Sequence, residues 1–207
     1  MLQQTHCNGR RSDRTDGLIL LAVPTFENIS PETFRSIYAL KGDAVFDYVT
    51  GYDCAKARNA IVRKALDGGY DYVFMVDSDI IIPENALECL LEYPVDICFG
   101  VYPRKNNPEE TELFHKGTFS FEKRFTYKEI KEIGNVRVDV KGAGFGCALI
   151  KTDVFQKLNY PWFNFVSYED GDFLSEDLYF CMMAENFTMQ ADIRVRCKHI
   201  KRSIVGD

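Results

Sequence analysis

Several features that would indicate a secreted or membrane protein are missing from this sequence of 207 residues. No apolar run reaches the length of about 18 residues that suggests a transmembrane helix, and the longest run near the start covers 18–23. The first 16 residues are polar and lack the apolar core of a signal peptide. The seven cysteines form no C-x-x-C pair, which argues against a zinc knuckle or a disulfide framework. We therefore expect a cytoplasmic protein with reduced thiols, no transmembrane segment and a disordered lead-in over 1–16.

Basic residues are the minority. There are 25 lysines and arginines against 31 aspartates and glutamates, and the formal net charge is −6 at pH 7. A surface of this sign repels phosphates, so no nucleic-acid partner is expected. An acidic protein can still bind a nucleoside diphosphate where a metal ion or a local basic pocket offsets the charge. The oligomeric state is not indicated by the sequence.

Strand and helix signals alternate through the first half of the chain. Short apolar runs predict buried strands at 18–23 and 72–76, and further strands at 44–50 and 95–101. Amphipathic patterns predict helices between them at 31–38, 57–66 and 83–92. The first helix has Ser30 as a good N-cap and Pro31 at its first position. This alternation predicts an α/β fold, with a mostly parallel central sheet flanked by helices in a single domain over 17–207.

The pattern becomes irregular after Pro103. The polar stretch 103–135 predicts a variable loop or lid, because long irregular segments in compact domains usually have a function. The glycine-rich segment 142–146 lacks the spacing of the dinucleotide-binding fingerprint. It is interpreted either as a loop that passes close to a substrate or as a set of bends. Regular elements are expected again at 136–140, 147–150, 152–158, after Ser175, and at 193–197.

The strongest candidate site follows the third predicted strand. That strand ends in Asp77-Ser78-Asp79, a D-x-D pattern. Ligands of open α/β sheets bind just outside the carboxyl ends of the strands, and residues i and i+2 of an extended segment point the same way. Two carboxylates placed there suit a divalent cation that carries phosphates. The alternative interpretation is a solvated turn before the next helix.

Two later patterns are candidates for chemistry. With Ser175 as N-cap, Glu176 and Asp177 would lie in the first turn of a helix, where the partial positive charge favours an ionised carboxylate. A general base needs that ionised form. His199 follows a short predicted strand, and a neutral imidazole is a good ligand for Mn²⁺-like ions. The ordinary alternatives are helix-end acids and a surface histidine.

Three other residues have both a functional and a structural interpretation. Arg58, near the start of the second helix, would meet a phosphate or a base, or would be solvated. Trp162, the single tryptophan, would stack on a sugar ring, although aromatic pairs more often belong to the core. Gly144 would lie in the loop close to a substrate.

In their order along the chain, these short motifs resemble those of GT-A-type nucleotide-sugar glycosyltransferases, close to the family 2-like bacterial and phage enzymes. The matching segments are 23–25, 57–59, 76–79, 144–151, 161–163, 175–177 and 198–199. Together they span nearly the whole chain after the lead-in.

The resemblance implies a hexosyltransferase that moves a sugar from a UDP- or GDP-sugar to a hydroxyl of a saccharide or another acceptor. Asp79, with His199 and Asp77, would hold a divalent metal, Mn²⁺ or Mg²⁺, on the donor diphosphate. The donor pocket would be formed by Thr25, Glu27, Arg58, Asp77, Ser78 and Asp79.

The resemblance also implies roles on the acceptor side. Asp177, with Glu176 beside it, would be the catalytic carboxylate, and Trp162 and Gly144 would contact the acceptor. The Q-x-x-R-W signature of processive synthases is absent, and the stereochemical course stays open.

Two alternatives to a glycosyltransferase are kept. Asp77-x-Asp79 and the later segment 171–177 also resemble motifs of haloacid-dehalogenase-type phosphatases. In that family, however, the nucleophile follows the first strand, and here two predicted strands precede it. A degenerate, non-catalytic binder of sugar nucleotides is the second alternative.

Overall fold

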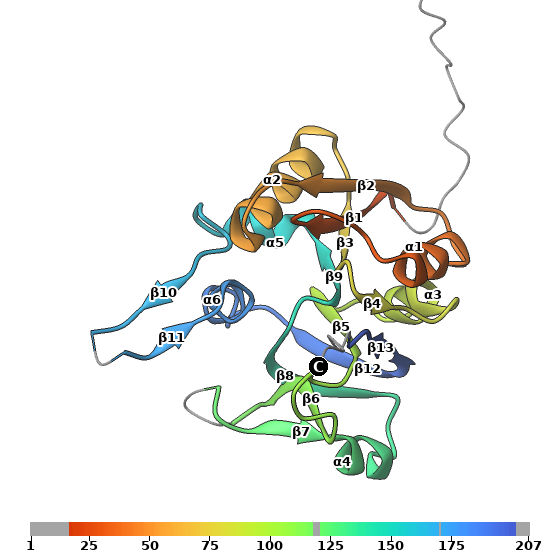
Figure 1. Ribbon diagram of the computed structural model, residues 1–207, viewed down its shortest axis with the longest axis vertical. Coiled ribbons are helices and arrows are strands. Elements are labelled where there is room, and N and C mark those ends of the chain that lie inside the picture. The colour runs from red at the N-terminus through yellow and green to blue at the C-terminus, as the bar shows by residue number, and fades with distance from the viewer. Residues whose placement is uncertain (1–16, 118–120, 170, 202–207) are drawn as a thin grey trace, which may run out of the picture.

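The computed structural model describes residues 17–117, 121–169 and 171–201, so the predicted lead-in over 1–16 lies outside the described residues. Strands and helices alternate singly from β1 to β3, and beyond β3 strands also follow one another directly (Figure 1). The strands are β1 (Ile19–Thr25), β2 (Val45–Thr50), β3 (Tyr72–Val76), β4 (Ile80–Ile81), β5 (Ile97–Val101), β6 (Glu110–His115), β7 (Arg124–Thr126), β8 (Arg137–Ala143), β9 (Cys147–Lys151), β10 (Val166–Ser167), β11 (Phe173–Leu174), β12 (Met189–Arg196) and β13 (Lys198–His199). The helices are α1 (Pro31–Tyr38), α2 (Cys54–Asp67), α3 (Ala86–Leu91), α4 (Tyr127–Glu132), α5 (Thr152–Lys157) and α6 (Glu176–Met183).

A nine-stranded sheet forms the centre of the described molecule, in the order β2-β1-β3-β9-β5-β12-β8-β6-β7. Parallel pairs join β1 to β2 and β3, and β5 to β12. The strand β9 runs antiparallel between β3 and β5, and β8, β6 and β7 continue the sheet by antiparallel pairing. The strands β2, β1, β3, β5, β12 and β6 therefore share one direction. The predicted single-domain α/β fold with a mostly parallel central sheet is confirmed in that six of the nine strands share one direction. The sheet is nevertheless mixed, because β9, β8 and β7 run the opposite way and only three of its eight strand pairings are parallel.

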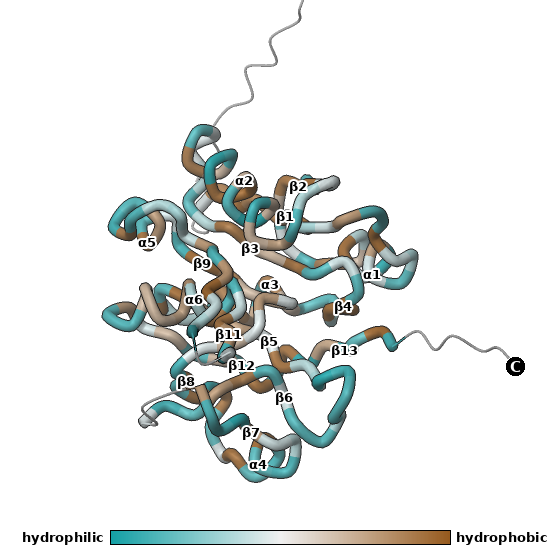
Figure 2. The backbone as a smooth tube through the Cα atoms, turned by 60° about the vertical axis from the view of Figure 1, so that its left-hand side comes forward, coloured by the Kyte–Doolittle hydropathy of each residue, from teal (hydrophilic) through white to brown (hydrophobic). Residues whose placement is uncertain are grey.

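The central strands are buried on both faces because helices cover both sides of the sheet. On β1, Leu20 and Ala22 join one core cluster with side chains of α2, α5 and α6, whereas Leu21 and Val23 join another with side chains of α1 and α3. Strands covered in this way are apolar without alternation. Figure 2 shows them as brown stretches in the middle of the molecule.

The segment 103–135 contains more regular structure than its sequence suggests, so the expectation of an irregular loop is wrong for the parts that form strands and a helix. It contains β6, β7 and α4, and the two strands extend the sheet beyond β8. The side chain of Thr126 accepts a hydrogen bond from the Glu129 backbone, and the Glu129 side chain accepts one from the Thr126 backbone, which forms a capping box at α4. The strand β7 has only 3 residues, which is too short for the alternation of apolar and polar residues to be recognised in the sequence. A lid function for this segment stays a prediction.

The longest helix in the described part of the chain is α2, with 14 residues. A helix that crosses a bilayer needs about 20 apolar residues, and no described helix has the length and apolar character to do so.

Two local arrangements position the functional region. The carboxyl ends of β1 and β3 lie side by side, which brings Thr25 near Asp77. The short strand β13 pairs with β4 so that His199 lies opposite Ile80, and the backbone of Ile200 donates a hydrogen bond to the carbonyl of Asp79 at 2.9 Å. The end of the described chain is thereby attached to the D-x-D turn.

Candidate functional site

A cavity of about 470 Å³ opens at the carboxyl ends of β1 and β3. Its lining consists of Pro24, Thr25, Phe26, Tyr52, Asp53, Cys54, Ala57, Asp77, Ser78, Asp79, Tyr102, Lys105, Glu112, Gly144, Asp177 and His199. The lining comes from segments that are far apart in sequence and includes seven of the residues expected from sequence: Thr25, Asp77, Ser78, Asp79, Gly144, Asp177 and His199.

The carboxylate of Asp79 has two neighbouring side chains, the ammonium of Lys105 and the imidazole of His199. Its Oδ2 atom is paired with the ammonium of Lys105, and its Oδ1 atom lies 3.6 Å from Nε2 of His199. Burial by itself would raise the pKa of Asp79, but the hydrogen bonds from His199 and Lys105 outweigh burial and lower the pKa to about 2. Asp79 is therefore ionised at neutral pH.

The orientation of His199 is set by its second nitrogen. Nδ1 lies 2.8 Å from the backbone carbonyl of Pro103 and must donate to it, because a carbonyl oxygen only accepts. The ring also packs edge-to-face on Tyr102, with centroids 5.5 Å apart. Burial opposes the charged imidazole, but the bonds to Asp79 and to the Pro103 carbonyl raise the pKa of His199 above its ordinary value. Because Nδ1 is bonded to the Pro103 carbonyl, the ring is oriented with Nε2 toward Asp79.

Asp79 and His199 fit part of a metal site. A histidine that donates one ring N–H to a carbonyl and presents the other nitrogen is the usual arrangement of a metal ligand. Among the described residues, however, no group of three or more His, Cys, Asp or Glu side chains is placed to hold a metal ion. A cation held by two side chains would take its remaining ligands from water and from substrate phosphates, as divalent cations in nucleotide sites commonly do.

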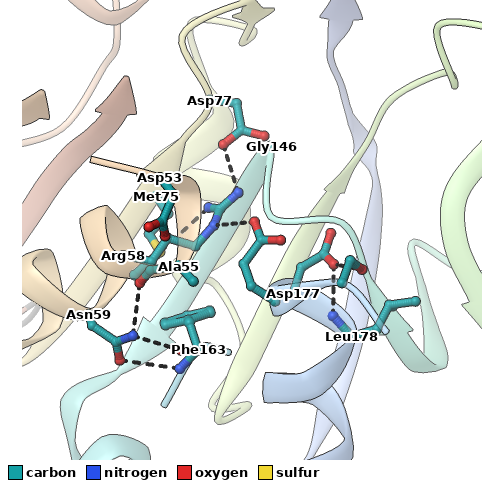
Figure 3. Close-up of polar contacts among 12 residues, drawn as sticks. Asp53, Ala55, Arg58, Asn59, Met75, Asp77, Gly146, Phe163, Asp177 and Leu178 are labelled. Atoms are coloured by element: carbon teal, nitrogen blue, oxygen red, sulfur yellow. Dashed lines mark hydrogen bonds and ion pairs between the residues drawn. The ribbon is translucent and has the colours of Figure 1, made fainter. Parts of the chain in front are cut away.

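Arg58 lies beneath the cavity and is not part of its lining, contrary to the expectation that it lines the donor pocket. Its guanidinium donates to Asp77 at 3.0 Å and to Glu176 at 3.2 Å, and only 2% of its side chain is exposed. Figure 3 shows Arg58 reaching up from α2 to Asp77. Burial opposes its charge, but the neighbouring Asp77 carboxylate raises the pKa of Arg58 well above its ordinary value. Arg58 thus holds two carboxylates in place from below.

The Arg58 contact separates the roles of the two acids in the first turn of α6. Glu176 is 7% exposed, is paired with Arg58 and does not line the cavity, so its expected catalytic place beside Asp177 is not supported by its position. Asp177 does line the cavity.

Asp177 is held by the start of its own helix. Its Oδ1 atom accepts hydrogen bonds from the hydroxyl of Ser175 and from the backbone N–H of Leu178, the latter at 2.8 Å (Figure 3). Ser175 occupies the N-cap position, but its side chain bonds to Asp177 and makes no cap bond to the helix backbone. Burial, together with the negative charge of Glu176, raises the pKa of Asp177 to about 6, whereas the helix end alone predicted a low value. A carboxylate with this pKa is mostly ionised at pH 7 and is a stronger base than an ordinary aspartate.

Two expected contacts are not made. Trp162 is 8% exposed and belongs to the core, where its Nε1 donates to the Phe155 carbonyl at 2.9 Å, so it is not available to stack on an acceptor at the cavity. Asn59, next to Arg58 on α2, fixes that segment by accepting from the backbone N–H of Trp162. Glu27 is exposed and lies outside the cavity lining.

Several lining residues were missed in the sequence. Phe26 and Tyr52 are 70% and 52% exposed, and both flank the end of the cavity near Thr25. Their signal was an aromatic residue within two positions of the end of each of two neighbouring strands. Tyr102 accepts a hydrogen bond from the Gly146 backbone at 3.0 Å. A Cβ at Gly144 would collide with the hydroxyl of Tyr102, so the glycine-rich segment is required for close packing at the cavity.

No protein-family model and no curated protein matches the sequence. Solved structures share the fold. A197 from STIV has a TM-score of 0.65 and 18% identity, over 89% of this chain and 86% of that chain. GalNAc-T7, crystallised with UDP, GalNAc and Mn²⁺, has a TM-score of 0.61 and 11% identity, over 91% of this chain and 45% of that chain. At such low identities the likeness concerns the fold, and the fold of this chain is GT-A-like.

Proposed function

We propose that this protein is a glycosyltransferase that moves a sugar from a nucleoside-diphosphate sugar, UDP- or GDP-linked, to a hydroxyl of a saccharide or another acceptor, with a divalent cation. One observation carries the proposal. Within a GT-A-like fold, a single cavity at the carboxyl edge of the sheet collects Asp79, His199 and Asp177 from three distant parts of the chain. The similar fold of GalNAc-T7, crystallised with UDP, GalNAc and Mn²⁺, supports the choice of ligand class.

The donor would lie along the D-x-D turn. Asp79 and His199, whose side chains lie 3.6 Å apart, would hold Mn²⁺ or Mg²⁺, which when bound would offset the negative charge of the leaving diphosphate. Thr25 and Ser78 line the same wall, and the exposed ring of Phe26 at its end offers a face for a nucleobase. Asp77 is 30% exposed and is held by Arg58, so its remaining oxygen suits a ribose hydroxyl.

Asp177 would act on the acceptor. Both hydrogen bonds that it receives within the described chain end on Oδ1, which leaves Oδ2 for the acceptor hydroxyl. Its raised pKa of about 6 matches a general base that works near neutral pH. Gly144 lines the cavity and would allow the close approach of an acceptor.

The two alternatives are less well supported. A phosphatase of the haloacid-dehalogenase type would need a free nucleophilic carboxylate at Asp77, but that carboxylate is paired with the buried Arg58. A non-catalytic binder would have no need for an ionisable Asp177 of raised pKa at the cavity wall.

Thermal unfolding with nucleotides tests the proposal directly. UDP and GDP are each added with Mn²⁺, and again with excess EDTA. A ligand at 100 times its dissociation constant adds about 2.7 kcal/mol, which for a chain of this size raises the unfolding midpoint by roughly 5–10 °C. We expect one nucleotide to give this rise and EDTA to remove it, and Asp79→Asn to lose the response. The absence of a rise with either nucleotide at saturation would reject the proposal.

A further inference from the structure

Lys105 is placed between two cavities that meet at Asp79. The first is the cavity described above. The second has a volume of about 440 Å³ and is also lined by Ser78, Asp79 and Lys105, and in addition by Lys201. The ammonium of Lys105 is paired with Asp79, the residue expected to bind the cation, and the side chain is 44% exposed.

The backbone that leads into Lys105 is fixed through the two residues before it. The carbonyl of Pro103 accepts from His199 at 2.8 Å. The backbone of Arg104 donates to the Glu110 carbonyl at 3.1 Å, and its guanidinium donates to the Glu110 carboxylate at 2.8 Å. The Lys105 side chain, by contrast, has its single ion pair within the described chain to Asp79. A long, flexible side chain on an anchored backbone can move between the cavities without any movement of the loop.

Simultaneous contact of a divalent cation and the Lys105 ammonium with the Asp79 carboxylate is electrostatically unfavourable. Both are positive, and like charges a few ångströms apart in a partly buried site repel strongly. A nucleoside diphosphate, on the other hand, brings several negative oxygens to the same place, and a lysine ammonium is a common ligand of phosphate oxygens. The ion pair that Lys105 loses with Asp79 would therefore be replaced by an ion pair with the donor diphosphate.

We propose that Lys105 is a donor-binding residue with two partners: it neutralises Asp79 in the ligand-free protein and moves to the donor diphosphate when a divalent cation takes its place. This inference rests on the proposed function. The same side chain then lowers the affinity for the free cation and raises the affinity for the nucleotide. Binding of the metal is thus coupled to binding of the donor, because Asp79 is released only when the diphosphate offers Lys105 a second partner.

The variant Lys105→Met separates the two effects, since it keeps the length of the side chain and removes its charge. Mn²⁺ binding without nucleotide is measured from the electron paramagnetic resonance signal of the free ion. Binding of the nucleotide selected above is measured by calorimetry at saturating Mn²⁺. Lys41→Met is the matched control, because Lys41 makes an exposed ion pair with Glu84 at 3.7 Å, and neither residue lines the two cavities.

We expect Lys105→Met to bind free Mn²⁺ roughly tenfold more tightly and the nucleotide roughly tenfold less tightly, the usual size of one charge-assisted hydrogen bond. Lys41→Met should match the wild type in both. Changes in the same direction, or no change in either constant, would overturn the inference. If the wild type binds Mn²⁺ but no nucleotide, the proposed function fails, and the Mn²⁺ titration alone still shows whether Lys105 competes for Asp79.

Discussion

Replacing Asp177 with asparagine tests the assigned base and the cost of its charge in one variant. Asparagine keeps the shape and the Oδ1 atom, so it can still accept from Ser175 and from the Leu178 backbone. Each pKa unit is equivalent to about 1.4 kcal/mol. A pKa of about 6 in place of 3.8 therefore corresponds to a cost of about 3 kcal/mol for the charged form at pH 7. The folded protein holds this proton more tightly than the unfolded chain, so Asp177 reduces stability as the pH rises from about 4 through about 6.

We expect Asp177→Asn to be more stable than the wild type by about 1–3 kcal/mol at pH 7 and by roughly half as much at pH 5, because at pH 5 the Asp177 carboxyl of the folded wild type is already mostly protonated. Urea unfolding at the two pH values measures this difference. Turnover in a transfer assay should fall by about 10²–10⁴-fold, the usual contribution of a general base. Affinity for the nucleotide with Mn²⁺ should not change.

The matched control is Asp153→Asn. Asp153 also lies in the first turn of a helix, α5, but it is exposed and is not part of the cavity lining. Its replacement should cost about 0.3–1 kcal/mol through the loss of a favourable interaction with the helix end, and turnover should be unaffected. An Asp177→Asn variant that is less stable than the wild type at pH 7, or whose gain does not shrink at pH 5, would refute the electrostatic argument. Full turnover would refute the role as base.

Two further substitutions test the residues that hold the cavity in shape, Arg58 beneath it and Gly144 in its lining. Arg58→Met should lower the free energy of unfolding by about 3–5 kcal/mol, because two carboxylates lose a buried cation; a loss under about 1 kcal/mol in urea unfolding would contradict this role. Gly144→Ala should cost about 1–3 kcal/mol and reduce turnover, because the new Cβ collides with the Tyr102 hydroxyl. Gly134→Ala is its control, since a Cβ there meets no atom within 4 Å; equal stability of the two alanine variants would show that Tyr102 moves aside freely.

Much of the fold could be predicted from local patterns. The apolar runs were sufficient to place the sheet strands β1, β2, β3 and β5. The N-cap at Ser30 was sufficient to place the start of α1, where the side chain of Ser30 does accept from the Thr33 backbone. The antiparallel direction of β9 could not be predicted, because an apolar run looks the same whichever way the strand runs. The segment 103–135 was misjudged because its strands are short and carry charged residues.

The candidate site was predicted in part. Asp79, Asp177 and His199 lie on one cavity, as their motifs suggested. The predicted acceptor contact of Trp162 was wrong because an aromatic residue has the same sequence signal whether it packs in the core or binds a sugar. Lys105 was passed over because a lysine in a polar stretch is usually solvated.

Local sequence was enough to place the polar residue types at the ends of the strands and at the start of α6, because strand ends and helix caps depend on neighbours in the chain. The tertiary structure decided which of those residues are free to react. Arg58 binds Glu176 across 118 positions and leaves Asp177 at the cavity, while Lys105 reaches Asp79 across 26. Burial and charge pairing change the chemistry of a carboxylate, and both depend on residues that only the folded chain brings together.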